Sequence, residues 1–136
     1  MKIQGHDIIC DVKTTNNYND KYTEQCFCYE CQNFRLNFRS NYPEVVVFLE
    51  QFGVNIEFPL EIMELGFDVH KKRREYSVYY SIKGELPIDS ILLTISGTSI
   101  VLRNWNVASE AYSNTGMKEP FFIIEISELF INAHKH

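Results

Sequence analysis

The sequence has few glycines and none of the short motifs that build phosphate-binding or nucleophile loops. Only six glycines occur in 136 residues, and the patterns G-x-G-x-x-G, G-x-x-x-x-G-K-[ST], G-x-S-x-G and H-E-x-x-H are all absent. Loops that cradle phosphate depend on closely spaced glycines, so a nucleotide-dependent enzyme is disfavoured. We lean towards a protein without enzymatic activity.

Long apolar runs are also missing. The most apolar stretch, Phe121–Ile124, is far shorter than the about 20 residues that cross a bilayer. The segment Met1–Asp7 is polar and lacks the apolar centre of a secretory signal. We expect no membrane partner and a cytoplasmic location, where cysteines stay thiols or metal ligands rather than disulfides.

Positive charge is scarce outside one short run. The chain has 13 basic and 18 acidic residues, a net charge of −5, and four of the basic residues form the run Lys71–Arg74. A surface that is otherwise acidic repels phosphate backbones, so this pattern disfavours nucleic-acid binding. The run itself is typical of a solvated hairpin turn, and the acidic remainder suits a basic protein partner.

Aromatic residues are abundant, with ten Phe, eight Tyr and one Trp making 14% of the chain. These side chains favour pleated surfaces and bury a large area each. The length fits one domain, and no linker or repeat divides it. We therefore predict a single domain over residues 1–136 with a β-rich core.

The pattern of apolar residues predicts two helices between Cys28 and Gly53. Phe34 and Phe38 are four residues apart and share a helix face. A second helix is predicted with Asn41 as its cap and Pro43 in its first turn. Its buried stripe consists of Val45, Phe48, Leu49 and Phe52. The polar segment 14–20 before these helices is predicted to be a surface loop.

Strict alternation of apolar and polar residues predicts strands over 63–69 and 76–82, joined by a charged turn. Further strands are expected over 91–95, 100–102 and 121–126. Short connections imply antiparallel pairing. The predicted fold class is α+β, an antiparallel sheet of four to five strands with two helices packed on one face.

Three of the four cysteines lie close together in the sequence as C-x-C-x-x-C, namely Cys26, Cys28 and Cys31. Thiolates at this spacing can reach one metal ion, and structural zinc is held by four ligands. Cys10 is the candidate fourth ligand, and His6 is the alternative. Two other interpretations stay open, that the thiols are unligated core residues or that they carry thiol–disulfide chemistry.

Two aromatic residues are candidates for contacting a protein partner. Tyr79 falls on the outer face of its predicted strand, and Trp105 follows a strand end. Both could equally pack under a helix or loop. Glu64, Asp68 and His70 alternate along one strand face and could form a hydrolytic or metal site, although polar residues are also what a solvent-facing strand requires.

The chain resembles a group of small, uncharacterised, Bacillus-type bacterial proteins over roughly two-thirds of its length. The segments that carry this resemblance are Cys28–Phe34, Tyr42-Pro43, Phe48–Val54, Tyr79-Tyr80, Gly84-Glu85 and Phe121–Ile126. The resemblance implies a bacterial cytoplasmic domain and transfers no catalytic residue.

Taken together, these patterns predict a non-enzymatic domain that binds a protein partner, with the cysteine cluster contributing stability through one structural zinc. One version is an immunity-type protein that blocks a basic toxin domain, which would suit a small acidic chain. The alternative is a small metal- or thiol-dependent enzyme that uses the same cysteines.

Overall fold

The fold is described by a computed structural model that covers residues 1–19, 26–108 and 117–132. Its elements in chain order are β1 (Lys2–Ile3), β2 (His6–Asp7), β3 (Ile9–Cys10), α1 (Val12–Asn19), α2 (Tyr29–Asn41), α3 (Pro43–Glu50), β4 (Glu61–Asp68), β5 (Arg73–Glu85), β6 (Ser90–Ile95), β7 (Thr98–Asn104), α4 (Trp105–Ala108) and β8 (Phe121–Ile131). No described helix has the length and apolar character needed to cross a membrane.

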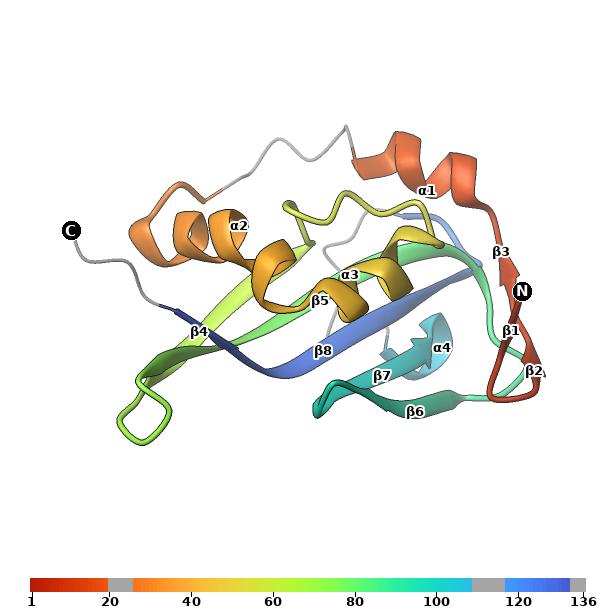
Figure 1. Cartoon of the computed structure of the whole chain (residues 1–136). Coiled ribbons are helices and arrows are strands. Elements are labelled where there is room, and N and C mark those ends of the chain that lie inside the picture. Colours follow the sequence, from red (N-terminus) through yellow and green to blue (C-terminus); the bar gives the residue numbers. More distant parts are fainter. Residues whose placement is uncertain (20–25, 109–116, 133–136) are drawn as a thin grey trace.

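The main sheet is antiparallel and strongly curled (Figure 1). Its strand order is β3-β5-β8-β7-β6, and β4 also pairs with β5. β4 and β3 use the same edge of the long strand β5 at different heights, since β4 pairs with 73–79 and β3 with 84–85. Register shifts interrupt the ladders of β4 with β5 and of β5 with β8. Such bulges increase local twist and bend a sheet.

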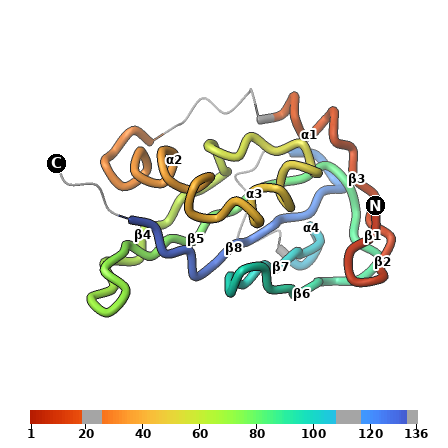
Figure 2. The backbone as a smooth tube through the Cα atoms, viewed as in Figure 1, coloured from red at the N-terminus to blue at the C-terminus, as the bar shows by residue number. Residues whose placement is uncertain are grey.

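The main core lies between the sheet and the α2–α3 segment. Tyr80 and Ile82 of β5 stand opposite Ile124 and Phe122 of β8, and all four side chains are buried. The helices add Phe34, Phe38, Val45 and Leu49 to the same cluster, and α2 and α3 pass over β5 and β8 in Figure 2. The Tyr80 hydroxyl donates to the Ile56 carbonyl at 2.6 Å, which satisfies the one polar atom of this large buried ring.

The α+β class and the antiparallel sheet are confirmed in outline, whereas the expected count of elements is too low. The main sheet has six strands when the short β3 is included. The described residues contain four helices rather than two. The second predicted helix begins after Tyr42, not Asn41, and no side chain caps it.

The predicted surface loop over 14–20 is wrong for residues 14–19, because residues 12–19 form helix α1, and residue 20 lies outside the described residues. The Asp11 carboxylate accepts a hydrogen bond from the Thr14 backbone N–H at 2.9 Å and so caps the helix. Thr15 is fully buried; its hydroxyl donates to the Asp11 carbonyl and accepts from the Lys83 backbone N–H. The helix therefore depends on a contact with β5 that local turn preferences do not reveal.

Candidate metal centre

The three clustered cysteines surround the start of α2. Cys28 is the N-cap residue, in an extended conformation with φ −63° and ψ 164°. Its carbonyl accepts the first helical hydrogen bond, from the Gln32 N–H at 3.0 Å. Cys31 lies in the first turn, and Cys26 precedes the cap by two residues. The change from extended chain to helix at Cys28 turns all three side chains towards one point.

The three sulfurs lie within 4.8 Å of one another. A tetrahedral zinc site with metal–sulfur bonds of about 2.3 Å places its sulfurs about 3.8 Å apart, so they need to approach by about 1 Å at most. Cys26 and Cys28 are exposed and Cys31 is buried, and all are free thiols. Among the described residues, no further cysteine, histidine or carboxylate joins this group. We call Cys26, Cys28 and Cys31 the thiol cluster.

The local environment shifts the pKa values of Cys26 and Cys31 in opposite directions. The pKa of Cys26 is lowered, chiefly by the Cys28 backbone N–H that donates to its sulfur, and further by the neighbouring thiols and by Arg35. The pKa of Cys31 is raised to about 12, first by burial and then by hydrogen bonding in which its thiol is the donor to the other two sulfurs. Cys26 therefore gives up its proton before Cys31 does, and its thiolate accepts hydrogen bonds from the neighbouring thiols.

Arg35 fixes the thiol cluster to the rest of the molecule. Its Nη1 donates to the Cys26 carbonyl at 2.7 Å, and its Nε donates to the Glu57 carbonyl at 3.2 Å. The guanidinium also lies 5.3 Å from the ring centre of Phe27 and 4.6 Å from that of Phe58. A planar cation held by two aromatic rings and by two hydrogen bonds loses little further freedom. No sequence motif marks Arg35, although its position one turn after Cys31 is a usable signal.

A cavity of about 190 Å³ adjoins the thiol cluster. Cys26, Cys31 and Arg35 form one wall. The rest of the lining comes from the segment that enters β4, namely Pro59, Leu60, Glu61 and Ile62. Cys26 and Cys31 thus border a space that a small ligand or a side chain can enter.

The structure does not bring Cys10 to the thiol cluster, which corrects the prediction of a four-cysteine site. Cys10 pairs with Gly84 in the β3–β5 ladder, whereas the start of α2 contacts the other end of β5 through the Tyr76 hydroxyl, which donates to the Glu30 carbonyl. Eight residues of strand separate these two contacts, roughly 25 Å at about 3.3 Å per residue. The Cys10 thiol is half-buried beside the Phe52 carbonyl, and burial raises its pKa to about 11.

The alternative ligand His6 does not join the thiol cluster either. It lies in β2 and pairs with Ile3 in the hairpin that precedes β3, at the end of the sheet opposite to the start of α2 (Figure 1). The two candidates for the fourth ligand therefore belong to a different end of the molecule. Their spacing in the sequence could not reveal this, because α1 and residues 20–25 intervene.

Tyr79 and Trp105 are half-buried rather than fully exposed. Both pack against a second apolar cluster formed by Met117, Phe121 and Ile123. The Tyr79 hydroxyl also lies 3.6 Å from the Met63 sulfur. The structure therefore places both rings among apolar side chains, so that only part of each is available to a partner.

Glu64, Asp68 and His70 do not converge on a site. The Glu64 carboxylate accepts from the Gly66 backbone N–H at 2.8 Å and pairs with Arg74 at 3.1 Å. Asp68 accepts from the Lys71 backbone N–H in the turn, and His70 is exposed beyond the strand. The bulge after Glu64 breaks the alternation on which the hypothesis depended.

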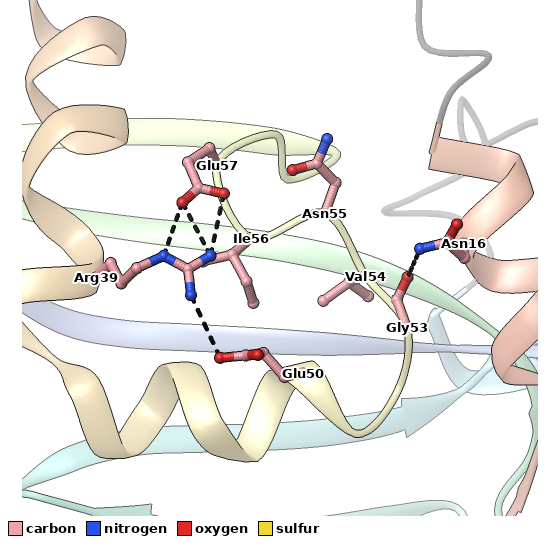
Figure 3. Close-up of a pocket in the computed structure, with 8 residues that line it drawn as sticks. All are labelled: Asn16, Arg39, Glu50, Gly53, Val54, Asn55, Ile56 and Glu57. Carbon is pink, nitrogen blue, oxygen red and sulfur yellow. Dashed lines mark hydrogen bonds and ion pairs between the residues drawn. The ribbon is translucent and has the colours of Figure 1, made fainter.

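A second, polar cavity of about 330 Å³ lies between α1, α3 and the segment 53–57 (Figure 3). The Arg39 guanidinium stands in its wall and pairs with Glu57 at 3.0 Å and Glu50 at 3.3 Å. These two carboxylates raise the pKa of Arg39. Because its charge is already balanced, Arg39 is a poor anchor for an anionic ligand, and the cavity offers less chemistry than the thiol cluster.

No protein-family model, curated protein or solved structure matches the chain.

Proposed function

We propose that the protein is a non-enzymatic, partner-binding domain whose thiol cluster holds one thiophilic metal ion, with zinc as the leading candidate. The observation that supports this is the approach of three cysteine sulfurs to within 4.8 Å of one another. Thiolates favour zinc, copper(I) and iron–sulfur clusters over magnesium or calcium. Zinc is preferred because the remaining position can take a nitrogen or oxygen donor at a tetrahedral centre.

An apolar pocket near the thiol cluster and the acidic balance of the whole chain support the partner-binding part of the proposal. Phe27 and Leu36 expose 68% and 73% of their surface, and they share a cavity of about 310 Å³ with Gln32 and Arg35. Exposed apolar side chains beside a pocket are typical of protein contact sites. The acidic balance of the chain favours a basic partner, as an immunity-type role would require.

Metal content decides the metal-binding part of the proposal. Protein purified without chelators is analysed for metals, alongside the variants Cys31→Ser and Cys10→Ser. We expect about one zinc per chain in the wild type and in Cys10→Ser, and loss of zinc in Cys31→Ser. Zinc that survives Cys31→Ser, or a wild-type protein that takes up no metal, would refute the proposal.

The partner-binding part is tested by affinity capture from the native host with the metal-loaded protein as bait. Leu36→Asp is the comparison bait that disrupts the proposed contact surface. Because Leu36 is exposed, its replacement leaves the core intact. A protein captured by the wild type and lost with Leu36→Asp supports the proposal. Recovery of the same proteins with both baits counts against it.

A thiol-dependent enzyme is the second candidate, favoured by the exposed Cys26 thiol with its lowered pKa beside a cavity. Reactive cysteines are partly exposed and low in pKa. This candidate predicts that metal-free protein reacts with iodoacetamide at Cys26 much faster than at the half-buried Cys10, and that it exchanges disulfides with a small dithiol. Equal, slow labelling of both residues would exclude it.

A further inference from the structure

We infer that the metal at the thiol cluster keeps one coordination position open towards the cavity between α2 and the segment 59–62, and that this position takes a neutral imidazole donor from outside the chain. This inference rests on the proposed metal binding and adds the chemistry by which a partner is recognised.

The first argument is the number and position of ligands. Three cysteines come together, and no fourth cysteine, histidine or carboxylate of the described residues joins them. Zinc and cobalt(II) complete a tetrahedron with a fourth donor. Cys26 and Cys31 both line the cavity of about 190 Å³, so the free position of an ion bound to their sulfurs opens into that space.

The size of the cavity admits a side chain. A volume of about 190 Å³ is well above what a single water needs, and it has room for an imidazole ring. Pro59, Leu60 and Ile62 supply an apolar wall against which the carbon edge of the ring can pack. The adjoining apolar pocket beside Phe27 and Leu36 shares Arg35 with this cavity, and so extends the surface for the residues that flank a histidine.

Charge selects the imidazole over a thiolate or a carboxylate. Three thiolates around a divalent ion leave one excess negative charge, and the Glu61 carboxylate lines the same cavity. Arg35 is the neighbouring cation, but its guanidinium is held by the Cys26 and Glu57 carbonyls and by two rings. A neutral nitrogen donor adds no further repulsion, and the set of three cysteines and one histidine is a common zinc environment.

Cobalt(II) provides a direct readout because its visible bands report coordination number and donor type. The metal-loaded full chain is titrated under argon with imidazole, and in a second arm with a short peptide that carries one histidine between two leucines. We expect a saturable shift of the visible bands while the sulfur-to-cobalt charge-transfer band persists. Glu61→Gln should give the same spectrum as the wild type before addition and the same response afterwards.

Each outcome distinguishes this inference from the metal-binding proposal. If the cobalt spectrum responds to neither probe, the chain itself supplies the fourth ligand. If the probes change the spectrum of Glu61→Gln only, Glu61 is that ligand. Either result overturns the inference but leaves metal binding intact. Failure to take up cobalt refutes both. If the peptide binds more tightly than imidazole and this higher affinity is lost in Leu36→Asp, the donor is a histidine of a protein. If both probes bind equally tightly, the donor is a small imidazole.

Discussion

At the residue scale, the thiol cluster is produced by local chain geometry and then fixed by one side chain. Cys28 ends the extended segment and begins α2, which brings Cys26 and Cys31 to the same point. Arg35 then holds the Cys26 carbonyl at 2.7 Å. The sequence spacing was sufficient to predict this group of three, because its members lie within six residues of each other. It could not predict the exclusion of Cys10, which depends on where β3 pairs with β5.

Arg35→Lys should weaken metal binding without unfolding the protein. Lysine keeps the charge but cannot hold the Cys26 and Glu57 carbonyls and the two rings at the same time. Loss of a group that orients a metal ligand typically lowers affinity by about 10–100-fold. Competition with a chromophoric chelator measures the change.

Arg39→Lys is the matched control, since Arg39 lies one turn further along α2 and pairs with Glu50 and Glu57 instead. An equal loss of metal affinity in both variants would show that Arg35 acts only through the general stability of α2.

The ionisation of Tyr76 should make the protein less stable at alkaline pH. Burial raises its pKa from 10 to about 12, so between these values the unfolded chain loses a proton that the native protein retains. The unfolded state then binds fewer protons, and the free energy of unfolding falls as pH rises from about 10 to 12. In urea titrations, Tyr76→Phe should show a smaller fall over this range than the wild type.

The same variant should lose about 1–2 kcal/mol at neutral pH, because the hydroxyl donates to the Glu30 carbonyl and accepts from Asn33. An unchanged slope between pH 10 and 12 in Tyr76→Phe would contradict the assignment of this titration to Tyr76.

At the element scale, the spacing of apolar residues predicted where most helices and strands occur. Tertiary contacts determine where each of them begins and ends. The alternation of Tyr76, Tyr80 and Ile82 placed β5 correctly, yet the strand extends from Arg73 to Glu85 because its ends pair with β4 and β3. Helix α1 was missed for the opposite reason. Its polar residues resemble a turn, and the buried contact of Thr15 with Lys83 overrides that preference.

Gly53 follows α3 and packs against the start of α1, and its replacement should be costly. Its φ of +82° disfavours any L-residue, and a Cβ there would lie 2.5 Å from the Val12 carbonyl oxygen. Gly97 has a similar φ of +76° with open space around it. Gly97→Ala should therefore cost about 1–2 kcal/mol, and Gly53→Ala about 3 kcal/mol or more, measured by urea denaturation. Equal costs would mean that the contact of α1 with Gly53 does not constrain the fold.

At the scale of the whole molecule, the core and the thiol cluster are separate structures. The main core joins α2, α3 and the sheet without any of the three clustered cysteines. A sheet of this size with its own apolar core does not need a metal to fold, in contrast to small zinc domains.

Removal of the metal should therefore leave the protein folded. Chelator-treated protein is expected to keep its far-ultraviolet circular dichroism and a cooperative thermal transition, with a Tm lowered by several degrees because the ion stabilises only the native state. Complete loss of structure on chelation would mean that the cluster organises the core. A Tm that is identical with and without metal would mean that the ion does not bind the native state.

X-ray absorption at the zinc edge of the full chain tests the central claim most directly, because it counts the sulfur ligands. The account predicts three sulfurs at about 2.3 Å and one nitrogen or oxygen donor at about 2.0–2.1 Å. A shell of four sulfurs, or a shell without sulfur, would contradict a three-cysteine centre with one open position.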